Sequence, residues 1–137
     1  TMQNEGVDGA MYYDAEVEHF CGLYTVITEK KAKPYYAFLG FNALKQLGTQ
    51  IEAEGFEFGK GYYAVAAAND KEAAIMISNF NAEDTEIEID ASRYGKSVDI
   101  YLLDDTYNME IVYSFGTEDG KFKVEAKKNS VMVIKIR

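Results

Sequence analysis

The sequence predicts a mainly β fold, an antiparallel β-sandwich of about seven to eight strands preceded by one α-helix over residues 34–47. Two observations indicate the sandwich. Apolar residues in the second half of the chain recur at every second position, which is the period of a strand with one buried face. Turn-prone Asn, Asp and Gly residues separate these runs at roughly 10–12 residue intervals, which is typical of a sandwich.

Seven segments carry this strand period. The alternation is clearest over 86–90, which is Glu-Ile-Glu-Ile-Asp, and over 121–127. The last segment is apolar on both faces for most of its length, which predicts a central position in a sheet. Asp119-Gly120 is typical of a two-residue hairpin turn. The predicted strands are 62–68, 73–80, 86–90, 97–104, 109–115, 121–126 and 131–136.

The predicted helix 34–47 has clear signals at both ends. Pro34 suits the first helical position, where its missing N–H costs nothing, and Gly48 suits the left-handed residue that ends many helices. Between them the segment is apolar nearly all round, and such a helix requires contacts on two sides. We therefore expect it to lie against the sandwich or to pair with a second copy of the chain as a homodimer.

The first part of the chain differs in organisation from the rest. Residues 9–15 and 23–28 are predicted as short extended segments, and with the helix they form a βα unit. We therefore divide the chain into a strand–loop–helix segment, 1–49, and a sandwich, 50–137. The stretch 50–60 is interpreted as the seam between them or as a first edge strand.

Composition excludes several classes of function. The net charge of −9 repels phosphate backbones and anionic membrane surfaces, so neither nucleic acid nor a membrane is an expected partner. No run of 18 apolar residues occurs, so no transmembrane helix is expected. Cys21 and His19 are the only cysteine and histidine, so neither a disulfide nor a metal site is expected. The sequence contains no cofactor-binding fingerprint, and we expect no cofactor.

Four short motifs occur in order along nearly the whole chain: YYDA at 12–15, KPYYAF at 33–38, SNF at 78–80 and NSV at 129–131. In this order they resemble the C-terminal region of glycoside hydrolases of the retaining (β/α)8 clan. The similarity is greatest to family 39-like enzymes of the β-xylosidase and arabinofuranosidase type. The resemblance implies the end of a catalytic barrel followed by an accessory β-sandwich.

The resemblance also implies that this chain alone is not an enzyme. In that clan the two catalytic glutamates end the fourth and seventh barrel strands, and only something like the eighth strand is present here. The chain is therefore expected to be a non-catalytic accessory domain of a glycosidase that acts on plant or other polysaccharide, with the catalytic barrel as its partner. The first residues lack the pattern of a signal peptide, so none is expected in this chain, and the resemblance does not decide whether the parent is secreted, periplasmic or other.

Tyr12, Tyr13 and Asp14 are the candidate substrate-proximal residues. The C-terminal end of a barrel strand faces the active site, where a tyrosine can stack on a sugar and Asp14 can accept a hydroxyl hydrogen bond. Strand alternation allows only one of the two tyrosines to point inward, and both could instead pack in the core. Asp14 with Glu16 and Glu18 is interpreted as an exposed acidic loop.

Two alternatives to a structural accessory domain remain at this point. One is a carbohydrate-binding module, which would show a row of two or three exposed aromatic side chains on one sheet face. We expect Tyr101, Tyr107 and Tyr113 instead to pack across strands. The other is an immunoglobulin-like interaction module, which would show a large exposed apolar patch.

Overall fold

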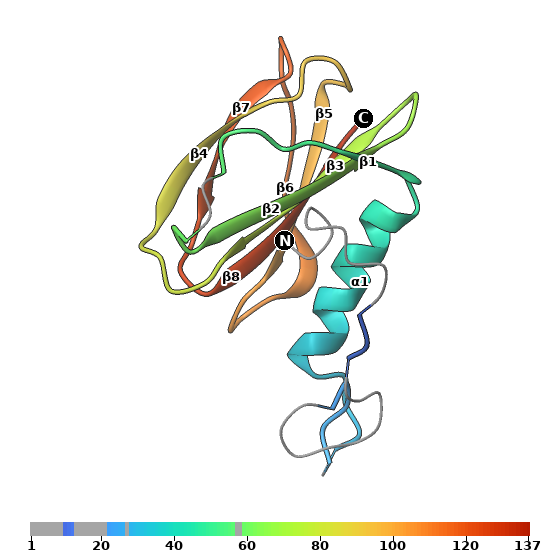
Figure 1. The fold of residues 1–137 in the computed structure, drawn as a ribbon, viewed down its shortest axis with the longest axis vertical. Coiled ribbons are helices and arrows are strands. Elements are labelled where there is room, and N and C mark those ends of the chain that lie inside the picture. The colour runs from blue at the N-terminus through green and yellow to red at the C-terminus, as the bar shows by residue number, and fades with distance from the viewer. Residues whose placement is uncertain (1–9, 13–21, 27, 57–58) are drawn as a thin grey trace.

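A computed structural model describes residues 10–12, 22–26, 28–56 and 59–137, and these residues form three layers (Figure 1). One helix, α1 (Lys33–Lys45), lies on a large sheet, and a small sheet covers the opposite face. The mainly β architecture predicted from the sequence is confirmed. The strands are β1 (Thr49–Ile51), β2 (Tyr62–Ala68), β3 (Ala73–Asn79), β4 (Thr85–Asp90), β5 (Ser97–Leu103), β6 (Asn108–Gly116), β7 (Lys121–Ala126) and β8 (Ser130–Ile136).

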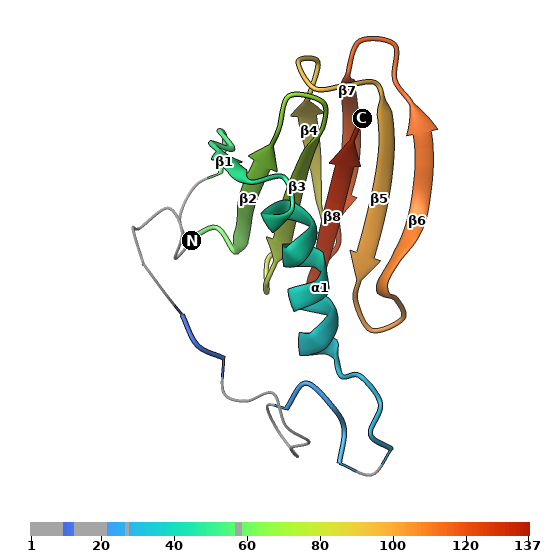
Figure 2. The ribbon, with the colours of Figure 1, turned by 90° about the vertical axis from the view of Figure 1, so that its right-hand side faces the viewer.

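The large sheet has the strand order β1-β2-β3-β8-β5-β6, and the small sheet consists of β4 and β7. All the strand pairs are antiparallel. Figure 2 shows α1 on the near side of the large sheet, with β4 and β7 behind it. As the sequence predicted, β8 is central, between β3 and β5. Its buried Ile134 and Met132 face the small sheet, whereas its buried Val133 faces α1.

The two sheets enclose the larger apolar core. Ile89 on β4 and Phe122 and Val124 on β7 pack with residues of the large sheet, and their polar neighbours face solvent as the alternating sequence requires. A buried polar side chain also joins the layers. The Asn79 Nδ2 donates to the backbone carbonyls of Ala126, at 2.9 Å, and Glu83, at 3.1 Å. The end of β3 is thereby tied to β7 and to the turn that leads into β4.

The second core lies between α1 and the large sheet. Leu44 is buried there with Met109 and Val133. Gly40 lets the helix come close: a Cβ at this position would lie 2.6 Å from Met109 Cε and 3.0 Å from Val133 Cγ2. At the start of the helix, the Lys33 Nζ donates to the Tyr107 carbonyl at 3.0 Å and to Asn108 Oδ1 at 2.8 Å. The helix is therefore held on the sheet along its length, which agrees with the expectation that it lies against the sandwich.

The ends of α1 differ slightly from the predicted 34–47. The helix begins at Lys33, so Pro34 occupies the second position, still within the first turn where no N–H partner is needed. It ends at Lys45, and Leu47 donates its N–H to the Leu44 carbonyl at 3.0 Å in a tightened last turn. Gly48 has the predicted left-handed backbone, with a φ of +85°.

The hairpin predicted at Asp119-Gly120 is wrong. β6 pairs with β5 and β7 pairs with β4, so this turn carries the chain from one sheet to the other. Gly120 is required there for a tertiary reason. It has a φ of +78°, its carbonyl accepts the Ala91 N–H at 2.9 Å, and a Cβ would lie 2.4 Å from Ser92 Cα.

The extended segment predicted at 23–28 is also wrong for its described residues. Tyr24 forms an isolated bridge to Lys31, and the Thr25 N–H donates to the Lys30 carbonyl at 2.8 Å. A turn closed by these bonds replaces the strand. Residues 10–12 have no regular structure, and the rest of 9–15 lies outside the described residues.

The stretch 50–60 contributes only the end of a strand. β1 is the edge of the large sheet and pairs with β2, with Gln50 opposite Ala67. The interpretation as a first edge strand is therefore confirmed at its start, and 52–56 is not strand. The division of the chain into 1–49 and 50–137 stays a prediction.

Replacing Gly40 by valine tests the close approach of α1 to the sheet. The new side chain would overlap Met109 and Val133, and overpacking of this kind costs about 1–3 kcal/mol. We expect a lower urea midpoint than that of the native chain. Asn42→Val, on the exposed side of the same helix, is the control and should change the midpoint little. Equal midpoints for the two variants would contradict this packing.

Candidate functional site

The side of α1 that faces away from the sheet carries two large apolar side chains beside polar ones such as Asn42. Phe38 is 48% exposed and Leu39 is 47% exposed, whereas Gly40 and Leu44 on the opposite side are buried. The Tyr12 ring packs edge-on against Phe38, with centroids 5.2 Å apart. We call Tyr12, Phe38 and Leu39 the outer surface of α1. It is a patch that a helix covered on both sides would bury.

Aromatic rings also surround the beginning of α1. The Tyr35 ring lies 5.4 Å from Tyr36 and 5.8 Å from Tyr24, measured between centroids. The Lys31 ammonium lies 4.4 Å from the Tyr35 ring centroid, and a hydrogen bond to Tyr35 raises the pKa of Lys31. This cluster extends the aromatic character of the helix toward the residues that precede it.

A groove lies between edge strand β6 and strand β7, with a volume of 490 Å³. We call it the β6–β7 groove. Tyr113 and Phe115 of β6 line it together with apolar Leu102 and Met132. The rings are 65% and 36% exposed, respectively. Lys123 and Glu125 of β7 are among the charged residues that line it, so it combines aromatic, aliphatic and charged groups.

A larger groove of 690 Å³ lies on the other side of the small sheet, between β4 and the stretch that follows β1. It has aliphatic lining from Ile51, Ile75 and Ile87, and Glu52 and Glu54 are among its carboxylates. Within the described parts of the chain, no group of three or more His, Cys, Asp or Glu side chains is arranged to hold a metal ion. The groove is therefore an acidic surface hollow without a metal-binding constellation.

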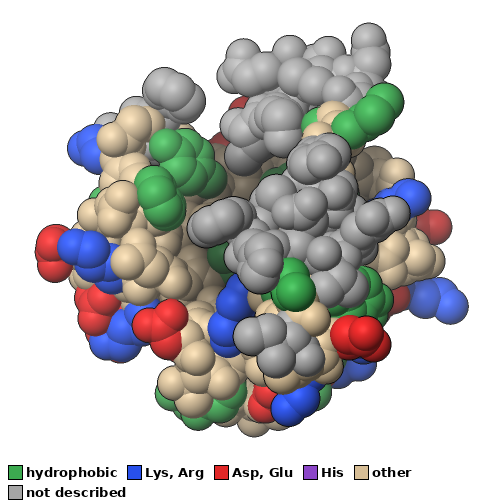
Figure 3. Space-filling view, turned by 90° about the horizontal axis from the view of Figure 1, so that it is seen from below, with side chains coloured by type: hydrophobic (Ala, Val, Ile, Leu, Met, Phe, Trp, Pro, Cys, Tyr) green, Lys and Arg blue, Asp and Glu red, His purple; other side chains and the backbone are tan. Residues whose placement is uncertain are grey.

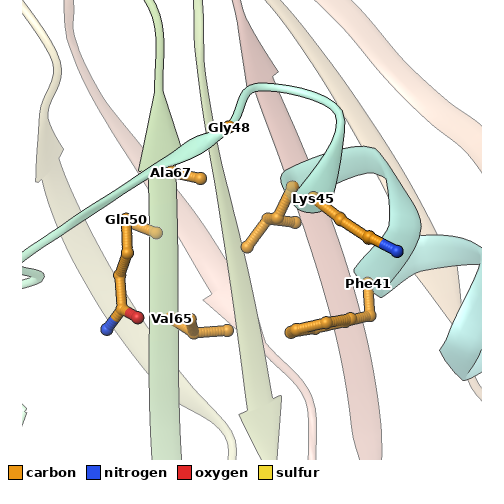
Figure 4. Close-up of a pocket in the computed structure, with 8 residues that line it drawn as sticks. Phe41, Lys45, Gly48, Gln50, Val65 and Ala67 are labelled. Carbon is orange, nitrogen blue, oxygen red and sulfur yellow. The ribbon is translucent and has the colours of Figure 1, made fainter. Parts of the chain in front are cut away.

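A small cavity of 170 Å³ lies where α1 ends and β1 begins. Phe41 of the helix faces Val65 of β2 across it, and Gln50 borders it from β1 (Figure 4). It is smaller than the ligand pockets of about 300–1,000 Å³ that proteins generally use. We interpret it as a packing defect at the edge of the helix–sheet contact.

Charged residues of the small sheet form cross-strand ion pairs. Lys123 Nζ lies 2.6 Å from Glu86 Oε1, and Lys121 Nζ lies 3.2 Å from Asp90 Oδ2. The Ser92 hydroxyl donates to Asp90 at 2.7 Å, and this bond, with the Ser92 N–H and Lys121, lowers the pKa of Asp90 to about 2. Figure 3 shows the molecule from below, where acidic and basic side chains alternate around much of its outer edge.

A hydrogen bond from Lys127 likewise lowers the pKa of Asp84. Both shifted carboxylates, Asp84 and Asp90, therefore favour the charged form. A general acid in a glycosidase requires the opposite shift.

Among the helices of the described residues, none is long and apolar enough to cross a bilayer.

The three predicted substrate-proximal residues are only partly placed. Tyr12 is 42% exposed and contacts Phe38, so it belongs to the outer surface of α1. Tyr13 and Asp14 lie outside the described residues, as do Glu16, Glu18, His19 and Cys21. Their role near a substrate stays a prediction.

The three sandwich tyrosines do not form one row. Tyr101 is half-buried on the helix side of the large sheet, with the Lys135 ammonium 5.0 Å from its ring centroid. Tyr107 is 38% exposed and lies on the β5–β6 connection. Tyr113 instead shares its groove with Phe115, a residue that the sequence analysis missed. The available signal was their spacing, because residues i and i+2 of a strand share a face.

No protein-family model matches the sequence, and no curated protein matches it. Solved structures do match the fold. A family 30 endoxylanase from Clostridium papyrosolvens C71 has a TM-score of 0.70 at 17% identity over 83% of this chain. A family 30 subfamily 8 xylanase from Clostridium acetobutylicum has a TM-score of 0.69 at 19% identity over 84%. A glucosidase from Croceicoccus marinus has a TM-score of 0.66 at 15% identity over 83%.

These matches are longer than the sandwich alone. They cover about 114 of the 137 residues, whereas β1 to the C-terminus spans residues 49–137, so they include residues that precede β1. The chain spans 30–32% of those three proteins. The fold is thus one that occurs as a minor part of glycoside hydrolases. The finer resemblance to the family 39-like type is not confirmed by these neighbours and stays a prediction.

The hydrogen bonds to Asp90 give a pH-dependent stability. Its pKa falls from 3.8 to about 2 in the folded chain, so its contribution is present above pH 3.8 and is lost as the pH falls toward 2. We expect Asp90→Asn to lose less stability than the native chain between these pH values, measured by urea unfolding. Glu88→Gln on the same strand is the control. A variant as acid-sensitive as the native chain would contradict the assignment.

Proposed function

We propose that this chain is a non-catalytic accessory domain of a glycoside hydrolase, attached to the catalytic barrel through the outer surface of α1. The observation that carries the proposal is the two-sided helix. One side of α1 packs on the sheet through Gly40 and Leu44, while Phe38 and Leu39 on the other side remain about half exposed.

The occupant of this surface is argued from the length of the similar proteins. This chain corresponds to 30–32% of the neighbouring glycosidases, so roughly two-thirds of such an enzyme would lie outside it. Covering a large apolar side chain stabilises a protein by about 1.5–3 kcal/mol. The remainder of the enzyme is therefore the partner that we assign to Phe38 and Leu39, with a second copy of the chain as the competing occupant.

The chemistry of the described carboxylates supports a non-catalytic role. A retaining glycosidase needs two carboxyl groups about 5 Å apart, one of them with a raised pKa. The pKa values of Asp84 and Asp90 are shifted downward, and both carboxylates form ion pairs with lysines at the ends of the small sheet. In this proposal the barrel supplies the catalytic glutamates, and plant or other polysaccharide is the substrate of the parent enzyme.

The double substitution Phe38→Asp with Leu39→Asp tests the docking. In the full-length natural protein that contains this chain, the two new carboxylates would be buried against the barrel. Burying them costs about 2 kcal/mol or more of stability. We expect a lower thermal midpoint there. In the isolated 137-residue chain the same positions are half exposed, so the midpoint should change little. Differential scanning calorimetry measures both.

Phe80→Asp is the matched control, because Phe80 is 66% exposed on the β3–β4 connection and should have the same small effect in both proteins. Equal effects of the double substitution in the two proteins would contradict docking through this surface. A concentration-dependent dimer of the isolated chain that the double substitution disperses would assign the surface to a second copy instead.

A further inference from the structure

We propose that the β6–β7 groove is a binding site for a neutral oligosaccharide, with the rings of Tyr113 and Phe115 as its platform. The choice of saccharide as the ligand class rests on the proposed function, whereas the groove itself is a feature of the fold. The site lies on the opposite side of the large sheet from α1, so it is separate from the proposed docking surface.

The strand register explains why these two rings are exposed. Tyr113 lies opposite Ile100, and Phe115 lies opposite Val98. Ile100 and Val98 are buried between the two sheets, so the rings share the inner face of the large sheet. In the described part of the chain the small sheet consists of β4 and β7, whereas β6 lies at the edge of the large sheet, as Figure 2 shows. The inner face of β6 is therefore only partly covered, which leaves Tyr113 65% exposed and Phe115 36% exposed.

The two rings suit the apolar face of a sugar. Residues i and i+2 of a strand are separated by about 6.8 Å, so Tyr113 and Phe115 present neighbouring aromatic surfaces along the groove. The Phe115 ring packs edge-on against Phe122, with centroids 5.7 Å apart, which restricts its motion before any ligand arrives. Leu102 and Met132 add aliphatic lining between the sheets. The C–H face of a pyranose fits such a surface, and its hydroxyl groups would point toward the polar rim.

The rim of the groove favours a neutral ligand. Two lysines, Lys123 and Lys127, and two carboxylates, Asp104 and Glu125, line it, so their formal charges cancel. Lys127 Nζ lies 2.7 Å from Glu125 Oε1, and Lys123 is paired with Glu86. Charges already satisfied in this way offer hydrogen bonds to hydroxyl groups but little net attraction for a phosphate or a cation. The 490 Å³ volume lies in the range of small-ligand sites.

An added peptide strand is the competing occupant, because β6 is an edge strand. The side chains of Lys123, Glu125 and Lys127 are 59%, 57% and 49% exposed. A strand laid along the groove would remove these ion pairs from water, and such desolvation is costly. A saccharide instead leaves the heads of the charged groups wet and in contact with hydroxyls. The observations therefore favour the saccharide.

Titration of the 137-residue chain with xylotetraose and with cellotetraose, followed by ¹H–¹⁵N NMR, tests the site. We expect saturable shifts confined to β5, β6 and β7 for at least one of the two probes. Tyr113→Ala and Phe115→Ala should each weaken that binding by about tenfold. Tyr107→Ala and Phe80→Ala remove exposed rings that do not line the groove, and their affinities should match that of the native chain.

The absence of shifts at probe concentrations of about 10 mM, shifts that map elsewhere, or shifts that Tyr113→Ala leaves unchanged would each overturn the proposal. The proposed docking is tested separately. Phe38→Asp with Leu39→Asp should leave saccharide binding intact. Conversely, Tyr113→Ala should leave the docking to the barrel intact, as measured by the thermal midpoint of the natural protein. A segment of that protein seated in the groove, detected as loss of the probe shifts in the longer chain, would replace the saccharide with a peptide strand.

Discussion

The large sheet is apolar on both faces, and the rest of the structure depends on this constraint. Its central strand β8 buries Ile134 toward the small sheet and Val133 toward α1. A sheet of this kind is stable in water only when two other layers cover it. The helix and the β4–β7 pair are those layers, and both are joined to the sheet by specific contacts, Gly40 against Met109 on one side and Asn79 to the Ala126 carbonyl on the other.

Neither the helix nor the small sheet matches the large sheet fully, and both candidate functions depend on the apolar side chains that stay exposed as a result. The helix is apolar on more sides than the sheet can cover, which leaves Phe38 and Leu39 outside. The small sheet has fewer strands than the large one, which leaves Tyr113 largely exposed and Phe115 partly exposed on the inner face of β6. In our proposals the barrel of the parent enzyme covers the first surface, and a neutral oligosaccharide binds at the second.

Local sequence patterns were sufficient to predict the features that depend on neighbouring residues, such as the exposed and buried faces of a strand. The alternation over 86–90 gave a strand with one wet face, and the two apolar faces of 131–136 placed that strand at the centre of the sheet. Pairing partners are set by tertiary contacts instead. Asp119-Gly120 has the sequence of a hairpin, yet Gly120 serves a crossing between sheets against Ser92. Tyr113 was assigned to packing because the sequence does not reveal that the second sheet stops short of β6.

The central claim is that these residues belong to a larger hydrolase whose barrel covers the outer surface of α1. The coding sequence upstream of the Thr1 codon tests this most directly. We expect an open frame that continues upstream through most of a (β/α)8 barrel, about 200–250 residues of alternating strands and helices, with glutamates at the ends of the fourth and seventh strands. An in-frame stop codon shortly upstream of the Thr1 codon would contradict it, because Phe38 and Leu39 would then have no barrel to contact.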